Sequence, residues 1–227
     1  MKSNVPPQPT LLGAEHDVHT AEQHNLFFSL WPDDATRQQI AATAAELKQR
    51  HQPQGRWIKA HRYHLTLKFL GEYAPLPAGL IERASAAASN VRAQAFVMNL
   101  DQAGSFASRT IPWWLGCSQA TDGLHRLSSD LHDALCRAGI RMLSSRLIPH
   151  VTVLRDGIAS LATTPIPAIQ WPVDEFVLID SRLGARAEYC PATQPRSASA
   201  ITSHQEYPST QPCTETGVPV GSMVING

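Results

Sequence analysis

Tyr63-His64-Leu65-Thr66-Leu67-Lys68-Phe69-Leu70-Gly71 is a short apolar run that contains a His and a Thr two positions apart. Later in the chain, Ile148-Pro149-His150-Val151-Thr152-Val153-Leu154-Arg155 repeats this arrangement. Side chains alternate between the two faces of a β-strand, so the His and the Thr of each run point the same way. The apolar residues between them point toward a packed layer. The chain holds only ten His, and two copies of one pattern among them predict a paired site.

The composition is that of an ordinary globular protein. Of the 227 residues, 43% are hydrophobic and 17% are charged, which is ample for a core. The formal net charge is zero, but the segment from His24 to Pro195 has a slight excess of Lys and Arg. This weak basic bias fits a small phosphate ligand and is too small to predict binding of a long duplex.

The cysteines and the apolar runs indicate in which cellular compartment the protein resides. The four Cys are scattered without a CxxC pair, which argues against a disulfide framework or a zinc finger and favours reduced thiols. No run approaches the roughly 18 apolar residues of a membrane span. The N-terminal residues also lack the apolar core of a signal peptide. We therefore expect a cytoplasmic monomer with no membrane contact.

Regular elements are expected in the middle of the chain. Segments with helical spacing predict helices at 35–50 and 77–88, and a third that follows Thr121 or Asp122 and stops at Gly139. Besides the two His runs, short apolar runs predict strands at 26–30, 96–100, 112–117, 173–181 and 185–190. Loops are expected at the polar residues 102–110 and around Pro165, Pro167 and Pro172.

The composition divides the chain into three parts. Residues 1–23 are expected to form a flexible extension, and residues 196–227, rich in Ser, Thr, Gln and Pro, a disordered tail. Residues 24–195 form the folded domain, whose elements run strand, helix, His strand, helix, strand, and then strand, helix, His strand, strand, strand. This plan predicts an α+β domain of antiparallel sheet with helices on its outer faces. A pseudo-two-fold duplication would bring His64 and His150 together across a cleft.

Two His and two Thr suit the cleavage of a phosphodiester. Water attacks the phosphorus while an ester oxygen leaves from the other side, so one group must accept a proton and another must donate one. His serves either role near neutrality, because its unperturbed pKa is about 6.5. A Thr hydroxyl on the same strand face can donate to the oxygens on which charge accumulates. This chemistry requires no metal or other cofactor, and the sequence has no HExxH motif.

The two runs also carry a family resemblance. His64-Leu65-Thr66-Leu67 and His150-Val151-Thr152-Val153 resemble the paired HxTx signature of the 2H phosphoesterase superfamily. The flanking residues, including Trp114-Leu115-Gly116 and 173–183, are similar to those of RNA 2′,3′-cyclic phosphodiesterases, also called 2′-5′ RNA ligases. The resemblance covers residues 25–192. It implies a bilobal fold in which two antiparallel sheets line a central groove, with helices on the outside.

The resemblance implies metal-independent hydrolysis of a 2′,3′-cyclic phosphate at an RNA end to a 2′-phosphomonoester. His64 and His150 would act as general acid and general base. The sequence does not settle which is which, although we prefer His150 as the base. Thr66 and Thr152 would bind phosphate oxygens. A single His on a half-buried strand is more often structural, and it is the repetition of the whole pattern that favours a functional pair.

Three further side chains are candidate substrate contacts. The resemblance makes Arg155 a phosphate contact, but it has the wrong strand parity for the face of His150. It therefore needs a bulge or a strand end to reach the site. Lys68 has the parity of His64 and could add positive charge there. Phe106, in the polar loop, could stack on a base. Alternatively, Lys68 is a solvated strand residue and Phe106 plugs the edge of a core.

Other functions are compatible with the same residues. The site could cut 2′-5′ linkages or a small cyclic nucleotide, and it could run the reaction backwards as a ligase. Alternatively, the protein could be a non-catalytic module that binds RNA ends through the same residues but does not hydrolyse them. A His-based metal site is a further alternative, and loss of activity with chelators would point to it.

Overall fold

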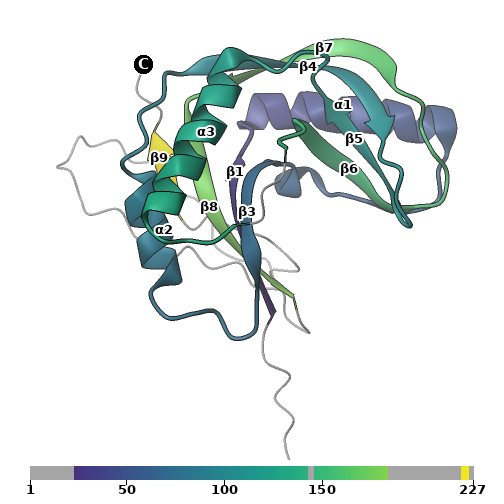
Figure 1. The fold of residues 1–227 in the computed structure, drawn as a ribbon. Helices are drawn as coiled ribbons and strands as arrows, with labels where there is room; N and C mark the ends of the chain where they lie inside the picture. Colours follow the sequence, from purple (N-terminus) through teal and green to yellow (C-terminus); the bar gives the residue numbers. More distant parts are fainter. Residues whose placement is uncertain (1–22, 143–145, 184–220, 225–227) are drawn as a thin grey trace, which may run out of the picture.

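The computed structural model describes residues 23–142, 146–183 and 221–224. Its strands form two antiparallel sheets: sheet A, with the order β3-β1-β8-β9, and sheet B, with the order β2-β6-β5-β4-β7 (Figure 1). The strands of sheet A are β1 (Gln23–Leu30), β3 (Leu65–Tyr73), β8 (Glu175–Leu183) and β9 (Gly221–Val224). Those of sheet B are β2 (Arg56–Trp57), β4 (Phe96–Ser105), β5 (Ile111–Gly116), β6 (His150–Gly157) and β7 (Thr164–Val173). The expected α+β class with antiparallel sheets is confirmed.

Three α-helices lie in the described ranges: α1 (Asp34–His51), α2 (Leu80–Ala88) and α3 (Asp122–Arg137), together with a 3-10 turn, η1 (Ala60–Arg62). The Asp33 carboxylate caps α1 by accepting a hydrogen bond of 2.6 Å from the N–H of Thr36. The Thr121 hydroxyl caps α3 in the same way. Helix α2 begins later than expected, because Gly79, at φ +70°, interrupts the helical backbone after Pro77.

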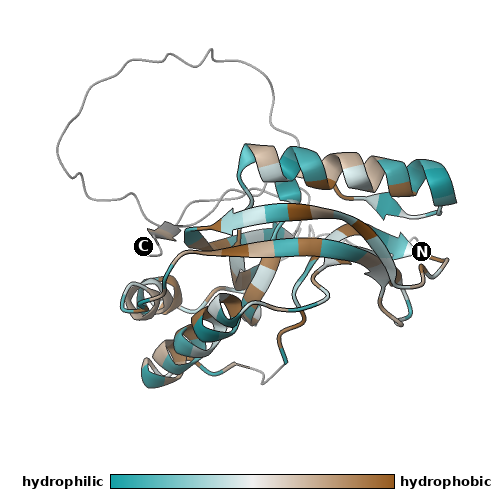
Figure 2. Cartoon of the chain, turned by 90° about the horizontal axis from the view of Figure 1, so that it is seen from above, coloured by the Kyte–Doolittle hydropathy of each residue, from teal (hydrophilic) through white to brown (hydrophobic). Residues whose placement is uncertain are grey.

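The two halves of the chain have the same plan. The elements β1, α1 and β3 correspond to β5, α3 and β6, and in each half the His strand pairs antiparallel with the strand before the helix. Each of these helices packs on the sheet of the other half. Helix α1 contacts β7 of sheet B, whereas α3 contacts α2, β3 of sheet A and also β4 of sheet B. Figure 2 shows α1 along one face of sheet B, on the side of the molecule opposite to α2 and α3.

The proline-rich segment is a strand, contrary to the loop expected there. Strand β7 lies at the edge of sheet B and pairs with β4. Proline has no N–H to donate, so it is tolerated in an edge strand, where one row of backbone groups needs no partner. Every second residue near its end, namely Ile169, Trp171 and Val173, is buried. The prolines therefore mark an edge strand with one buried face.

The structure also differs from the sequence-based expectations at β4 and β9, where strand is present in place of an expected loop and an expected disordered tail. Strand β4 continues to Ser105, so the segment expected as a loop from residue 102 begins only after the ladder with β5 ends. Strand β9 pairs with β8 and lies within 196–227, so the expected disordered tail does not hold for these four residues. The rest of that tail, the extension before Gln23 and the strand expected at 185–190 lie outside the described residues.

Buried apolar side chains form one large cluster and one small one. The large cluster is continuous through both sheets and the three helices. The small cluster consists of Phe27, Val177 and Ile179 on sheet A, and Trp31 packs against it. Phe27 alternates with Phe28 of the large cluster, so the small cluster lies on the opposite face of sheet A. We call this opposite face the site face of sheet A.

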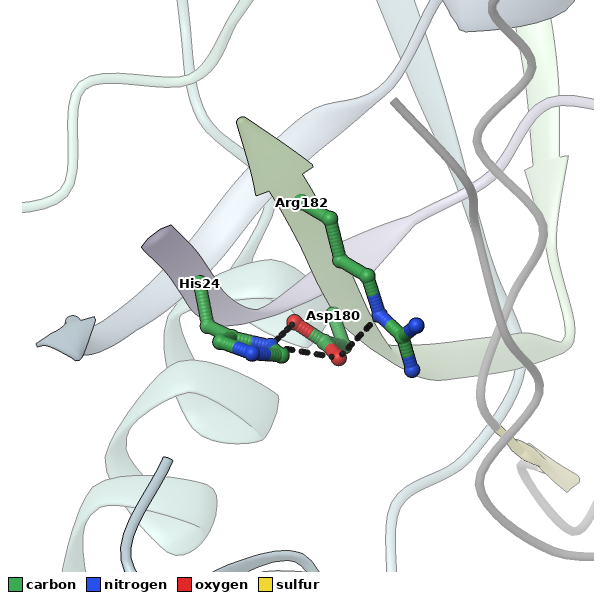
Figure 3. Close-up of polar contacts among 3 residues, drawn as sticks. All are labelled: His24, Asp180 and Arg182. Carbon is green, nitrogen blue, oxygen red and sulfur yellow. Dashed lines mark hydrogen bonds and ion pairs between the residues drawn. The ribbon is translucent and has the colours of Figure 1, made fainter. Parts of the chain in front are cut away.

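A polar cluster fastens β1 to β8 within sheet A. In Figure 3 the side chains of His24 and Arg182 approach the carboxylate of Asp180 from two directions. Nδ1 of His24 lies 2.9 Å from one carboxylate oxygen, and Nε of Arg182 donates to the other at 3.4 Å. Asp180 is only 2% exposed, and a buried carboxylate requires such partners. The cluster therefore joins the first strand of the fold to β8, near the end of the domain.

Candidate active site

His64 and His150 come together where the two sheets meet. His64 immediately precedes β3 and His150 begins β6, and these two strands, one from each sheet, contact each other. The positive charge of His150 contributes to lowering the pKa of His64, so the two imidazoles lie within electrostatic reach of each other. The structure thus brings the two predicted His residues to one place.

Both imidazoles are held in the same way. Nδ1 of His64 lies 2.8 Å from the carbonyl oxygen of Arg62. Nδ1 of His150 lies 2.7 Å from the carbonyl oxygen of Ile148. A carbonyl oxygen can only accept a hydrogen bond, so each Nδ1 must carry a proton. Nε2 of either ring is therefore the atom at which a proton is gained or lost, and this exchange requires no movement of the ring.

Aromatic rings surround the two imidazoles differently. Trp31 stacks on His64 with the ring planes 10° apart and the centroids 5.9 Å apart, and the Phe27 ring lies 5.2 Å from His64. Phe106 instead meets His150 at 84°, with the centroids 4.8 Å apart. The face of an aromatic ring attracts a cation. The parallel stack of Trp31 therefore favours the protonated form of His64.

The pKa values of both His residues are depressed in the free protein. Burial is the largest cause of the lowering of the pKa of His64 to about 4, and the charges of Arg155, Arg62 and His150 act in the same direction. The hydrogen bond to the Arg62 carbonyl opposes these effects. Burial also lowers the pKa of His150. An anion bound between the two rings would raise both values, because it would stabilise the imidazolium forms.

Thr66 and Thr152 occupy matching positions beside the two His residues. Thr66 lies opposite Ser29 in the β1–β3 ladder, and Thr152 lies opposite Trp114 in the β5–β6 ladder. Directly opposed residues share a face of the sheet. Ser29 Oγ and Trp114 Nε1 are buried and have no hydrogen-bond partner among the described residues. Each predicted phosphate ligand thus has a second polar group directly across the ladder.

A β-bulge follows the Thr in both His strands. One extra residue, Leu67 on β3 and Val153 on β6, stands between the Thr and the next paired position of the ladder. Simple alternation fails beyond such a bulge, because the residues after it are shifted by one position relative to the partner strand. Both halves of the fold therefore reorient the side chains that follow their HxT motif.

The bulge places Arg155 on the face of His64 and His150. Beyond Val153, Leu154 lies opposite Trp113, and both are fully buried in the large cluster. Arg155 therefore points to the other face of sheet B. Its charge contributes to the low pKa of His64, in agreement with this position. The bulge that Arg155 was expected to require is present.

The bulge at Leu67 turns Lys68 away from the site. The expectation from strand parity, that Lys68 shares the face of His64, is therefore wrong. Lys68 lies opposite Phe28, which is fully buried in the large cluster. Burial lowers the pKa of Lys68, and the charges of Asp133 and Cys136 oppose this effect. Both of these residues belong to α3. Lys68 therefore faces α3, away from His64.

Phe69 is a site residue that alternation alone does not predict. It lies opposite Phe27 on the site face of sheet A and is 41% exposed. An exposed aromatic ring on the same face as His64 is a surface on which a nucleobase can stack. The sequence contains a signal for it, because Phe69 follows His64 at the same interval at which Arg155 follows His150.

Phe106 supports His150. Its ring lies between those of His150 and Trp114, with a centroid separation of 5.5 Å from Trp114. The Trp114 ring in turn covers Gly104, where a Cβ atom would come within 2.6 Å of the indole. The absence of a side chain at Gly104 thus makes room for this stack. Contact of Phe106 with a base stays a prediction.

Arg62 and Arg56 bring additional positive charge that the HxTx pattern does not identify. Arg62 ends η1, and Arg56 lies opposite Arg155 in the β2–β6 ladder. Burial and the charges of Arg62 and Arg56 lower the pKa of Arg155. Asp156 lies 3.4 Å from Arg56, and both side chains are more than half exposed. A group of three guanidinium ions at this place favours a negatively charged ligand.

No group of three or more His, Cys, Asp or Glu side chains among the described residues is arranged to hold a metal ion. No helix of the described ranges is long and apolar enough to cross a membrane.

The chain is similar in sequence to known proteins. The family model described as LigT like Phosphoesterase matches residues 30–114. The RNA 2′,3′-cyclic phosphodiesterase of Escherichia coli (strain K12) is 34% identical over 177 residues, which cover 75% of this chain and 95% of that protein. The RNA 2′,3′-cyclic phosphodiesterase of Geobacillus stearothermophilus is 29% identical over 143 residues, which cover 59% of this chain and 45% of that protein.

Solved structures show the same fold. The crystal structure of E. coli LigT in apo form superposes with a TM-score of 0.64 at 25% identity, covering 91% of this chain and 99% of that one. The crystal structure of E. coli LigT complexed with 3′-AMP gives a TM-score of 0.61 at 32% identity, covering 74% and 92%. The motifs, the fold and the near-complete coverage of the E. coli relative agree. The chain therefore belongs to the family of LigT-like phosphoesterases that includes the RNA 2′,3′-cyclic phosphodiesterases.

Proposed function

We propose that this protein hydrolyses the 2′,3′-cyclic phosphate at the end of an RNA or oligonucleotide to a 2′-phosphomonoester, by paired His catalysis and without a metal. Cyclic phosphodiesterase activity is the one for which its relatives are named. The mechanism rests mainly on one observation: Nδ1 of His64 and Nδ1 of His150 are each hydrogen-bonded to a main-chain carbonyl oxygen. Both Nε2 atoms are therefore free to exchange protons. The E. coli neighbour complexed with 3′-AMP supports a nucleotide ligand.

In the proposed reaction, Nε2 of His150 accepts a proton from water while the water oxygen forms its bond to phosphorus. The bond between phosphorus and O3′ breaks, and Nε2 of His64 donates its proton to O3′. The product keeps the phosphate on O2′ and gains a free 3′ hydroxyl. The two His residues have then exchanged protonation states. Each proton transfer contributes about a hundred- to ten-thousandfold in rate.

The surroundings of the two rings support His64 as the acid. A general acid must be protonated when the substrate is bound. The negative charge of the cyclic phosphate raises the pKa of His64 from its low value in the free protein. The stacked ring of Trp31 adds to this stabilisation of the imidazolium. His150 has no such stack and is the base.

The remaining site residues bind the substrate. The hydroxyls of Thr66 and Thr152 donate hydrogen bonds to the non-bridging phosphate oxygens. The guanidinium of Arg155 balances the charge that builds on those oxygens as water attacks. The exposed ring of Phe69 stacks on the terminal base. Together these groups hold the phosphorus between the two Nε2 atoms.

The same groups can join RNA ends. If the 5′ hydroxyl of a second RNA takes the place of water, His150 accepts its proton and a 2′-5′ linkage results. We also propose that the protein acts as a monomer. The four scattered Cys favour a reducing compartment, so we infer that the protein works in the cytoplasm.

The test is hydrolysis by the purified protein in EDTA. The substrates are an oligoribonucleotide with a 2′,3′-cyclic phosphate end, adenosine 2′,3′-cyclic phosphate, and 2′-5′ oligoadenylate. We expect the first to be converted to a 2′-phosphate. His64→Gln and His150→Gln should each lower kcat by about a hundred- to ten-thousandfold, since each removes one proton transfer. The control is His125→Gln, an exposed position on α3, with unchanged turnover.

Several results would contradict the proposal. Near-wild-type turnover by either His variant, with far-UV circular dichroism showing an intact fold, would exclude the paired acid and base. Loss of activity in EDTA and its recovery with a metal would exclude metal-independent chemistry. Binding of the RNA end without turnover by the wild type would indicate a binding module. Faster cleavage of 2′-5′ oligoadenylate than of the cyclic end would assign the site to 2′-5′ linkages.

A further inference from the structure

Arg62 carries a charge that the proposed reaction does not use. It lies two residues before His64, and its main-chain carbonyl holds Nδ1 of that ring. The side chain is half-buried. Its charge contributes to lowering the pKa of His64, so it lies within electrostatic reach of that ring. Its guanidinium has no carboxylate partner in the described part of the chain. A cation kept at a reaction centre without a counter-ion is available to a ligand.

Arg56 and Arg155 extend this charge. They lie directly opposite each other in the β2–β6 ladder, so their side chains share a face. Arg56 and Arg62 both act on the pKa of Arg155, after burial, so the three guanidinium groups lie within reach of one another. Asp156, paired with Arg56, is the carboxylate at this place. Three positive charges beside one carboxylate can accept more negative charge than the single one of a cyclic phosphate.

The chemistry of an RNA end shows where a second negative charge lies. The cyclic phosphate bridges O2′ and O3′ of the terminal ribose. The base is attached at C1′, next to C2′, whereas the 5′ phosphate follows C4′, next to C3′. The base and the 5′ phosphate therefore leave the ribose from opposite ends of the cyclic phosphate. Any protein that binds both must place their two subsites on opposite sides of the reacting phosphorus.

The chain offers this arrangement around His64. Phe69 lies beyond His64 along β3, and Arg62 lies before it on η1. With the base on Phe69, the 5′ phosphate is directed toward Arg62. The direction of proton transfer agrees, because His64 donates to O3′, and O3′ is on the C4′ side of the ribose.

We propose that Arg62, assisted by Arg56, binds the 5′ phosphate of the terminal nucleotide, which in RNA is the phosphodiester that links it to the preceding nucleotide. The inference rests on the proposed function. It makes Arg62 a specificity residue. The enzyme then prefers cyclic phosphate ends that continue into an RNA chain over free nucleoside 2′,3′-cyclic phosphates.

The test compares two substrates that differ only in this group: adenosine 2′,3′-cyclic phosphate with and without a 5′ phosphate. In the wild type, the 5′ phosphate should raise kcat/KM by about ten- to a hundredfold, as expected for one charge-assisted hydrogen bond. In Arg62→Gln the ratio should fall to near one, mainly through KM. The substitution keeps the main-chain carbonyl that holds His64. The ratio is the readout, because the lost charge near His64 affects both substrates alike.

A matched control and a salt titration sharpen the result. Arg126→Gln removes one exposed charge on α3, and its ratio should equal that of the wild type. For a short oligoribonucleotide with a cyclic end, Arg62→Gln should reduce the slope of log(kcat/KM) against log[salt] by about 0.7, the value for one lost contact to a single strand. A wild-type ratio near one, or an unchanged ratio in Arg62→Gln, would overturn the inference while leaving the proposed function intact. Absence of hydrolysis of both substrates by the wild type would overturn both.

Discussion

His64 and His150 are oriented by main-chain carbonyl oxygens, and no carboxylate bonds to either ring in the described part of the chain. A carbonyl fixes the tautomer, but it lacks the full negative charge with which a carboxylate stabilises an imidazolium. Burial is therefore not compensated, and the pKa of each ring lies below its ordinary value. In the reaction proposed above, the substrate phosphate would supply the missing charge. At the scale of the residue, the low pKa values keep both rings neutral in the free protein near pH 7, and the proposed acid catalysis requires a bound anion that raises the pKa of His64.

The buried neutral ring of His64 should make the protein sensitive to acid. Its pKa is about 4 in the folded state and about 6.5 in an unfolded chain. Between these values the unfolded state binds a proton that the folded state does not, so the free energy of unfolding falls as the pH falls. The full effect of this shift is up to about 3 kcal/mol.

This prediction is measured by urea unfolding at pH 7 and pH 4.5. His64→Gln cannot titrate, so it should lose less stability than the wild type over this interval. His125→Gln, an exposed position, should lose as much as the wild type. Equal losses in His64→Gln and the wild type would show that the ring is not buried in its neutral form.

At the scale of the element, the paired bulges decide which side chains share a face with the two His residues. Without the extra residue, Lys68 would point toward the site and Arg155 away from it. With Leu67 and Val153 inserted into their ladders, these orientations are reversed. Phe69 then occupies the position on β3 that Arg155 occupies on β6. One half of the duplicated motif thus contributes an aromatic surface and the other half a cation.

Substitutions at the two cations test the bulges. Arg155→Ala should lower kcat by about a hundred- to a thousandfold, as expected for the loss of one group that stabilises the developing charge. Arg155→Lys should recover little, because an ammonium group cannot make the paired contacts of a guanidinium. Lys68→Ala should leave kcat and KM within about twofold, because its side chain faces α3 and no substrate contact is lost. A loss in Lys68→Ala comparable to that in Arg155→Ala would place Lys68 in the site after all.

At the scale of the whole molecule, the two halves exchange their helices. Helix α1 follows β1 of sheet A but packs on sheet B, and α3 follows β5 of sheet B but contacts sheet A. The large apolar cluster runs without interruption through both sheets. Each sheet is therefore covered in part by a helix that comes from the other half. The two His residues, one from each half, are held together by the same exchange.

This exchange predicts that both sheets unfold in a single transition. In Trp31→Phe the remaining Trp residues all belong to sheet B, namely Trp57, Trp113, Trp114 and Trp171. Their fluorescence then reports sheet B, whereas far-UV circular dichroism reports both sheets and all helices. The urea midpoints from the two signals should coincide, as they do for one cooperative unit. Separate midpoints would show that the lobes unfold independently.

The local sequence was sufficient for the α+β class, for α1 and α3 to within a few residues of their ends, and for recognising the pair of HxTx motifs. These features depend on periodicity and on neighbours within a few positions along the chain. The place of Lys68, the reach of Arg155, the exposure of Phe69 and the edge position of β7 were decided by the tertiary structure. Each of them depends on which strand pairs with which and where an extra residue enters the ladder. Strand pairing joins residues far apart in the chain, so no short window of sequence contains it.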